Sequence, residues 1–400
     1  LSLGASLQQY TSIPILTRNG VSSMSFKFTC IKCSHSHDQS QYRTLCTMCG
    51  SLLRAQYDQS KTKKPYSIPD KHGIGKYQPM LPITNSDNIV TMGEGNTPII
   101  KLTSLAKQVA IQQVYAKLEY VNPTGSFKDR GNAVQTSVLK ELGINRLAEI
   151  GAGNTGHSLA SYCVRAGITM DGFTSIYEKD SSKVKVIEGT GAHMHWIEGN
   201  KEKARKAMTL YCKETGILDL TYHLNPYFIE GNKTMAYEIV EQMDPLPENI
   251  VMTVGNGSQL LGLWWGFNEM KSIGRIARIP KLHGVQSTAF QPMVAAFHEK
   301  KWQHNDNNYT IAVGIRIPAP PRLEEAVKAC KQSGGHFIAV PDEETLDWQQ
   351  RLNMLEGLFV EATTSVALAG ATRMIENEII PSDENILFIL GGSGFKEPIP

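Results

Sequence analysis

The sequence predicts an α/β protein in which helices cover parallel β-sheets. From about residue 85 onward, short apolar runs alternate with amphipathic segments, and this alternation is typical of parallel strands joined by helices. Several of the apolar runs also end in a glycine-bearing loop that leads into a helix. With 400 residues the chain is too long for one ordinary core, so we expect one large or two intertwined domains.

The N-terminal residues 1–24 are rich in Ser and Thr, and no Asp or Glu occurs in the first 37 residues. A transit peptide has such a composition. A vector remnant or a disordered tail, with Met24 as the natural start, is the alternative. We therefore expect residues 1–24 to lie outside the fold.

A cysteine-rich module is predicted at residues 25–58. Its four cysteines have the spacing Cys-x2-Cys-x12-Cys-x2-Cys, which is typical of a four-thiolate structural zinc site. Four reduced cysteines without a metal are the alternative. The chain has an odd number of cysteines, seven, and this argues against a secreted disulfide framework and favours a reducing, cytoplasmic compartment. The expected zinc ligands are Cys30, Cys33, Cys46 and Cys49.

The catalytic region is predicted at residues 59–400, after a polar linker with turn-forming residues. Its expected strands are Ile99-Ile100, Leu147–Ile150, Val251–Val254, Lys281–Val285 and Ile386–Leu390. Its expected helices are Asp129–Leu142, Ser158–Gly167, Lys201–Glu214, Lys233–Gln242 and Thr364–Glu376.

The overall charge favours a small-molecule partner. Forty basic and thirty-eight acidic residues leave a formal charge of +2, which gives no reason to expect a nucleic-acid or anionic-membrane partner. No apolar run approaches the roughly 18 residues that span a bilayer.

Three strand ends carry glycine loops that suit an anionic ligand, at residues 151–156, 255–259 and 391–394. Glycines let backbone N–H groups approach an anion closely, and a helix N-terminus adds positive potential. One such loop alone is more simply a tight turn, but three in one chain indicate a shared pocket. None has the Gly-x-x-x-x-Gly-Lys-Ser/Thr pattern of a Walker loop, so ATP is not favoured.

A lysine lies at a predicted helix start, in the segment Asn122-Pro-Thr-Gly-Ser-Phe-Lys128-Asp-Arg-Gly131. The positive end of the helix dipole disfavours the protonated form of Lys128 and would help it act as an amine nucleophile. A surface lysine beside Asp129 and Arg130 is the alternative.

This segment resembles the cofactor-binding signature of fold-type II pyridoxal-phosphate (PLP) enzymes, and the threonine synthase family most of all. The resemblance covers roughly residues 90–398 as an ordered set of short motifs, each weak by itself. The motifs are Met92–Pro98, Ala152–Thr155 with Ser158–Tyr162 and Arg165–Gly167, Asn225–Thr234, Gly284–Gln286, Ala312–Ile317 and Phe359–Ser365.

The resemblance implies a role for each site residue. Lys128 would bind PLP covalently and shuttle protons, Asn154 would hydrogen-bond its phenolic oxygen, and Ser393 would face its pyridine nitrogen. The cofactor phosphate would lie in the loop Gly255, Asn256, Gly257, Ser258 and Gln259, and Phe127 would border the cofactor. The substrate carboxylate would bind at Gly151, Ala152, Gly153 and Thr155.

The resemblance also implies a fold of two three-layer subdomains, as in the β-subunit of tryptophan synthase. The smaller would span about residues 135–245 and close on the substrate, with the cofactor in the cleft between the two. A homodimer is also implied, as is a zinc ribbon of the kind that related enzymes often carry.

Two departures from the family leave the substrate open. Phe228 stands where threonine synthases usually carry an arginine that helps to bind the substrate phosphate, and a phenyl ring cannot replace that charged donor. Arg316 or Lys233 would then have to hold the phosphate. The segment Gly391–Lys396 is more similar to cysteate synthases, and so is part of the N-terminal region, at Leu52–Tyr57 and Gly73–Tyr77.

Three functions are therefore in competition. The first is a threonine-synthase-like PLP lyase that eliminates a β- or γ-leaving group and adds a nucleophile. The second is β-replacement or β-elimination on serine- or threonine-derived substrates. The third is an inactive PLP-fold protein that binds partners through the cysteine module.

Overall fold

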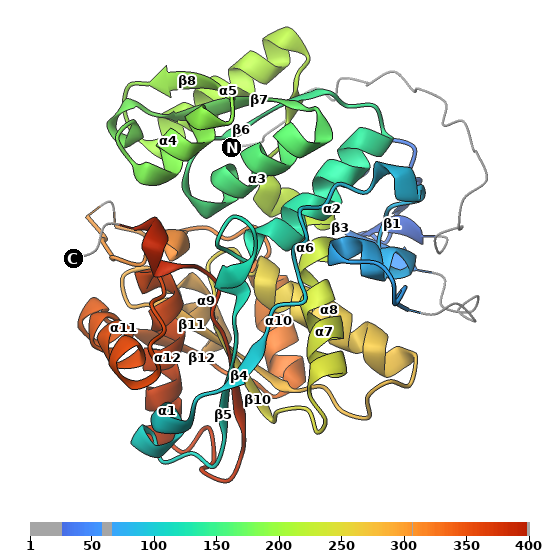
Figure 1. The fold of residues 1–400 in the computed structure, drawn as a ribbon. Helices are drawn as coiled ribbons and strands as arrows, with labels where there is room; N and C mark the ends of the chain where they lie inside the picture. Colours follow the sequence, from blue (N-terminus) through green and yellow to red (C-terminus); the bar gives the residue numbers. More distant parts are fainter. Residues whose placement is uncertain (1–25, 58–65, 306, 398–400) are drawn as a thin grey trace.

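Two β-sheets organise the chain into two α/β halves, and a small three-stranded module lies beside them (Figure 1). This computed structural model describes residues 26–57, 66–305 and 307–397. The tail expected at residues 1–24 is outside the described residues. The predicted α/β class is confirmed.

The larger sheet has six strands in the order β12-β11-β10-β13-β5-β4. Neighbouring strands are parallel except β4 and β5, which are antiparallel. β13 is buried at all four positions, as expected for a parallel strand covered on both faces. The strands are β4 (Ile99–Lys101), β5 (Val114–Lys117), β10 (Asn249–Thr253), β11 (Lys281–Ser287), β12 (Phe337–Val340) and β13 (Ile386–Ile389).

Helices cover both faces of the larger sheet, each over a core of its own. One core includes residues of α1 (Thr103–Gln108), α11 (Asp342–Glu356) and α12 (Ala362–Glu376). The other includes residues of the remaining helices of this half, and α7 packs against α8 there. These are α6 (Pro226–Asn232), α7 (Thr234–Gln242), α8 (Ser258–Ser272), α9 (Pro292–Phe297) and α10 (Leu323–Ser333).

The smaller sheet has four parallel strands in the order β8-β7-β6-β9. The strands are β6 (Arg146–Ile150), β7 (Thr169–Ser175), β8 (His193–Ile197) and β9 (Leu218–Asp219). The core on one face includes residues of α2 (Lys128–Glu141), α3 (Gly153–Ala166) and α4 (Ser182–Gly189), and α5 (Lys201–Thr215) covers the other face. This sheet lies at the top of Figure 1 and the larger sheet lies below it.

The cysteine-rich module is an antiparallel sheet of β1 (Phe26–Cys30), β2 (Ser36–His37) and β3 (Leu53–Tyr57), in the order β2-β1-β3. It shares a core with α2, α6 and α7, and the ring of Phe28 lies edge-on to that of Tyr227 at 4.8 Å. The module is thus packed on α2, which begins at Lys128, and on two helices of the larger half.

All of the strands and helices expected from the sequence are present, but several more were missed. α8 was missed because eleven of its fifteen residues are buried, so it lacks the polar stripe of an amphipathic helix. α3 begins at Gly153, five residues before the expected start at Ser158. This earlier start puts Asn154 and Thr155 into the first helical turn. Within the described residues, no helix is long and apolar enough to cross a membrane.

Candidate active site

A cavity of about 1490 Å³ lies between the two sheets. It is lined by the carboxyl ends of β6, β7, β10 and β13 and by the first turns of α2, α3, α4, α5, α8 and α12. Ligands of doubly wound proteins bind at this edge, because strand ends, glycine loops and helix N-termini meet there. The cavity is therefore the candidate active site.

Lys128 lines this cavity as the first residue of α2. Its Nζ lies 3.9 Å from the centroid of the Phe127 ring, and the N–H of Phe127 donates to the carbonyl of Gly391 at 3.1 Å. Burial lowers the pKa of Lys128 to about 8, with the nearby Lys396 cation acting in the same direction and the Glu361 carboxylate opposing it. Roughly a tenth of the amine is then neutral at pH 7, which suits a nucleophile.

Asp129 ties the turn before Lys128 to α3. Its carboxylate accepts hydrogen bonds from the backbone N–H of Thr124 at 2.7 Å, the hydroxyl of Thr124 at 2.5 Å and the hydroxyl of Ser158 at 2.6 Å. Burial raises the pKa of Asp129 to about 6, although these hydrogen bonds lower it.

Arg130 holds the same helix start from the other side. Its guanidinium donates to Glu119 at 2.7 Å and to Glu238 at 2.7 Å, and all three side chains are buried. Lys117 also lies 2.9 Å from Glu238. Lys128 is thus placed between two buried polar networks that keep its backbone in position.

The loop after β6 leads into α3 and carries the residues expected to bind a carboxylate. Gly153 has a φ of +63°, which favours glycine, and Asn154 and Thr155 follow it and line the cavity. Side-chain capping of the first turn of α3 is absent, so its backbone N–H groups are available to an anion. Residues 151–156 also have the Gly-x-Gly-x-x-Gly spacing of dinucleotide-binding loops. This spacing alone therefore does not distinguish a loop that binds a carboxylate from one that binds the pyrophosphate of a dinucleotide.

Asn154 reaches from the smaller half to the larger one. Its Nδ2 donates to the Glu361 carboxylate at 2.8 Å. Its Oδ1 is buried and has no hydrogen-bond partner among the described residues. An unsatisfied buried acceptor beside a cavity indicates that a ligand completes the site.

The loop after β10 is the second anion-binding candidate. Gly257 has a φ of +85° and precedes the first turn of α8, and a Cβ at Gly255 would lie only 3.0 Å from the carbonyl oxygen of Gly314. The Nε2 of Gln259 is buried and lacks a partner in the described part of the chain. All five residues from Gly255 to Gln259 line the cavity.

The C-terminal loop closes the site behind Lys128. Ser393 donates its N–H to the carbonyl of Gly125 at 3.0 Å, and its hydroxyl accepts from the N–H of Phe395 at 3.3 Å. Gly391 and Gly394 line the cavity, and Ser393 and Gly151 are adjacent to lining residues.

Of the residues predicted to bind cofactor or substrate, three do not line the cavity: Gly151 and Ser393, which are next in sequence to lining residues, and Phe228, which is not. Phe228 lies in α6 and is fully buried, and a Cβ at Gly131 would lie 2.5 Å from its ring. The ring therefore packs between α6 and α2, away from the cavity lining. Lys233 is also buried and forms ion pairs with Glu230 at 2.6 Å and Glu269 at 3.1 Å, whereas Arg316 lines the cavity.

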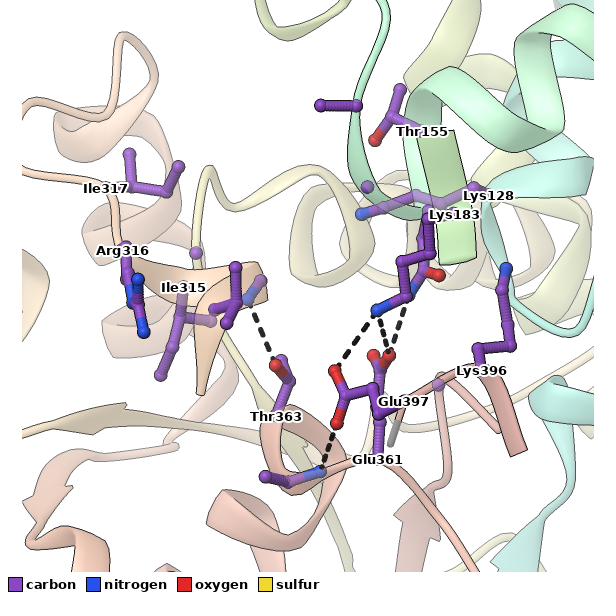
Figure 2. A pocket seen from close by; sticks show the side chains of 18 of the residues that line it. Lys128, Thr155, Lys183, Ile315, Arg316, Ile317, Glu361, Thr363, Lys396 and Glu397 are labelled. Atoms are coloured by element: carbon purple, nitrogen blue, oxygen red, sulfur yellow. Dashed lines mark hydrogen bonds and ion pairs between the residues drawn. The ribbon is translucent and has the colours of Figure 1, made fainter. Parts of the chain in front are cut away.

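Several charged residues of the cavity lining were not predicted from the sequence, among them Glu361, Lys183, Lys396 and Glu397. Figure 2 shows the side chain of Lys183 directed toward Glu361 and Glu397, with Lys396 beside them. Lys183 lies 3.1 Å from Glu397 and 3.6 Å from Glu361. Glu361 and Lys396 stand inside motifs that carried the family resemblance, whereas no sequence pattern marked Lys183.

The four cysteines of the N-terminal module lie together, with their Sγ atoms all within 4.8 Å of one another. The Cys30–Cys49 and Cys33–Cys46 sulfur distances are 3.4 and 3.6 Å. Tetrahedral zinc with bonds of about 2.3 Å would separate its sulfur ligands by about 3.8 Å. The Nε2 of His37 lies 3.4 Å from Cys46 Sγ and could orient that ligand.

Comparison with known proteins gives a consistent result. The family model described as "Pyridoxal-phosphate dependent enzyme" matches residues 90–392. Threonine synthase of Methanocaldococcus jannaschii is 34% identical over 92% of both chains, and threonine synthase of Methanosarcina acetivorans is 33% identical over 93% of both.

Solved structures share the fold at lower identity. The processed form of threonine deaminase isoform 2 from Solanum lycopersicum has a TM-score of 0.66 and 20% identity, over 74% of this chain and 79% of that one. Maize serine racemase has a TM-score of 0.64 and 19% identity, over 75% of this chain and 89% of that one.

Proposed function

Because this chain belongs to the threonine synthase family of pyridoxal-phosphate-dependent enzymes, we propose that it binds this cofactor through Lys128. It is a PLP-dependent lyase that acts on an amino-acid substrate. The observation that carries the placement of the cofactor is a lysine with a pKa lowered to about 8 inside the cavity between the two sheets.

The residues present fit the cofactor. The unpartnered Asn154 Oδ1 and Gln259 Nε2 leave polar atoms for a ligand at two sides of the cavity. The glycine-bearing loop 255–259 lines the cavity at the N-terminus of α8, where backbone N–H groups suit a phosphate. We assign Phe127, Asn154, residues 255–259 and Ser393 to cofactor binding. When bound, the cofactor supplies electron withdrawal from the substrate carbon.

The chain's own residues then bind the substrate and move protons. The backbone N–H groups of residues 153–155 at the start of α3 bind the substrate carboxylate, whereas those of Gly151 and Ala152 donate to the carbonyls of Phe173 and Ile150 at 2.9 Å. Lys128, through its amine, removes the Cα proton and returns a proton to the substrate carbons. The cavity walls exclude water from these steps.

The first substrate candidate is O-phosphohomoserine, from which the γ-phosphate leaves and water adds at Cβ to give threonine. Identity of 31–35% to threonine synthases over most of the chain supports it. The second candidate is β-replacement or β-elimination on serine- or threonine-derived substrates. The phenylalanine at position 228, where the family usually has an arginine, favours this alternative, whereas Arg316 lines the cavity and offers the first candidate another cation for a phosphate.

The deciding experiment offers the purified holoenzyme O-phosphohomoserine, O-phosphoserine, O-acetylserine, serine and threonine. Released phosphate and product mass are measured for each. Phosphate and threonine from O-phosphohomoserine support the first candidate, and its inertness beside turnover of a serine derivative supports the second. Lys128→Ala is expected to abolish turnover and the visible absorbance of the bound cofactor. If Lys128→Ala retains both, the assignment of Lys128 fails.

We also propose that Cys30, Cys33, Cys46 and Cys49 bind a structural zinc ion. The module packs on α2 and α6, so the metal would stabilise the wall behind the catalytic segment rather than take part in the reaction.

The quaternary structure, the compartment and the domain limits stay predictions. The family resemblance supports a homodimer, and sedimentation equilibrium tests it. Seven free thiols support a reducing, cytoplasmic compartment. The smaller subdomain is expected at about 135–245; its four strands lie between residues 146 and 219, and α7 packs on α8 of the larger half.

A further inference from the structure

Glu361 is a buried carboxylate of the cavity to which neither the sequence motifs nor the relatives assign a role. It is only 5% exposed and immediately precedes α12. Its N–H donates to the carbonyl of Gly392 at 3.1 Å, and a Cβ at Gly392 would lie 2.2 Å from its Oε1. The carboxylate is therefore packed against a glycine of the C-terminal loop, and this contact defines its position.

Cations from both halves of the molecule compensate this buried charge. Lys183 of α4 lies 3.6 Å from Glu361, and the carboxylate also interacts electrostatically with Lys128 and Lys396. A buried carboxylate without such partners would be strongly disfavoured. These cations offset the cost of burying the carboxylate.

The hydrogen bond between the two side chains has a definite direction, because Asn154 Nδ2 donates to a carboxylate oxygen of Glu361 at 2.8 Å. An amide has its donor and its acceptor at opposite ends, so Oδ1 points elsewhere, and it is buried without a partner in the described residues. The contact with Glu361 thus fixes which way the amide is turned and leaves the second N–H of Nδ2 for a ligand.

We propose that Glu361 is a positioning residue that holds the side-chain amide of Asn154 in the orientation required by the cofactor. This inference rests on the proposed placement of the cofactor beside Lys128 and Asn154. It adds a contact from the larger half that acts on the cofactor through a residue of the smaller half. The two residues are 207 positions apart in the sequence, so only the fold brings their side chains together.

The test is a double-mutant cycle of Glu361→Gln and Asn154→Ala, made in the full chain. Two properties are measured for each variant: the dissociation constant of pyridoxal phosphate and the absorbance maximum of the bound cofactor. Glutamine has the shape of glutamate but no charge, so it no longer selects one orientation of the amide. Loss of a charge-assisted hydrogen bond is expected to weaken cofactor binding about tenfold or more and to shift the absorbance maximum.

The cycle identifies the route of the effect. If Glu361 acts through Asn154, the E361Q substitution changes the dissociation constant less than about twofold in the N154A background. Equal effects of E361Q with and without Asn154 would overturn the proposal, as would an unchanged absorbance maximum in E361Q. The melting temperature of each apoprotein shows whether a variant has a folding defect. If E361Q does not fold, N154A still tests the proposal, because it must shift the absorbance maximum of the bound cofactor.

Glu376→Gln is the control. Glu376 is exposed as the last residue of α12, the helix that Glu361 precedes, and it does not line the cavity. E376Q removes the same charge and is expected to keep the absorbance maximum of the parent protein. If N154A leaves cofactor binding intact, the proposed cofactor site itself is wrong; if N154A weakens binding and E361Q does not, only this inference fails.

Discussion

Lys183 and Glu397 form an ion pair at 3.1 Å that joins α4, on the smaller sheet, to the segment that follows β13 of the larger sheet. Beside it the hydroxyl of Ser182 donates to the carbonyl of Lys396 at 3.1 Å. These contacts lie in the lining of the cavity and hold the two halves together.

Removing this contact is expected to open the cleft. Lys183→Met should speed hydrogen exchange in residues 182–189 and raise KM severalfold, because the substrate must then close a looser cleft. Lys185→Met, on the exposed side of the same helix, is the control. Equal hydrogen exchange in the two variants would contradict this role of the Lys183–Glu397 ion pair. Unchanged solution scattering on adding substrate would count against closure.

Lys396 is expected to keep the amine of Lys128 reactive near neutral pH. Its positive charge lowers the pKa of Lys128, so Lys396→Met should move that pKa upward from about 8. Because only the neutral amine captures the cofactor, the capture rate of the apoenzyme should reach half its maximum at a higher pH. Lys206→Met, on the exposed surface of α5, should leave the midpoint in place. A shift to lower pH in K396M would contradict this account.

The cysteine module is expected to depend on its metal. Cys46→Ser should abolish the bound zinc and lower the melting temperature, because the three remaining thiolates cannot complete a tetrahedral site. Metal content and thermal melting check this, and a strong chelator should reproduce the loss in the parent protein. Cys330→Ser, in the core of the larger half, is the control and should retain its zinc. Absence of zinc from the parent protein would refute the assignment.

His283 is expected to make the protein sensitive to acid. The buried ring accepts from the N–H of His336 at 3.2 Å and contacts Asn249 Oδ1 at 3.0 Å, and burial lowers its pKa to about 3. The folded pKa is below the unfolded value of 6.5, so stability is lost as pH falls through 6.5 toward 3. The loss at pH 5 is about 2 kcal/mol.

Denaturant unfolding at pH 7 and pH 5 measures this effect. His283→Gln should reduce the difference in the free energy of unfolding between pH 7 and pH 5 by about 2 kcal/mol. His193→Gln, with a ring that is 60% exposed, provides the comparison. An H283Q variant that keeps the full pH dependence would show that other groups cause it.

Arg130 is expected to be essential for folding stability. Arg130→Met would leave Glu119 and Glu238 buried without their guanidinium partner, and breaking a buried pair of this kind costs about 3–5 kcal/mol. Arg351 pairs with Asp347 at 2.7 Å with both side chains exposed to solvent, and it offers a comparison for which R351M should cost no more than about 1 kcal/mol. Denaturant unfolding of both variants measures the contrast, and similar losses would show that burial is not the cause.

The sequence by itself determined the parts of this protein that depend on neighbouring residues. Glycine loops after apolar runs predicted where strands end and helices begin, because turn geometry and strand burial are local properties. The lysine segment, the loops at 151–156 and 255–259 and the four cysteines could therefore be read from short patterns. The uniformly apolar α8 and the early start of α3 escaped such patterns, since neither has an amphipathic signature there.

Only the tertiary structure decided which of these residues act together. The hydrogen bond from Asn154 to Glu361 and the ion pair of Lys183 with Glu397 join positions about two hundred residues apart, and nothing local in the sequence encodes such contacts. Packing also placed Phe228 between two helices, outside the cavity where the motif had suggested it. Side-chain direction and burial depend on how the two halves pack together. The residues around Lys128 therefore could not be predicted from the sequence, whereas its role as an amine nucleophile could.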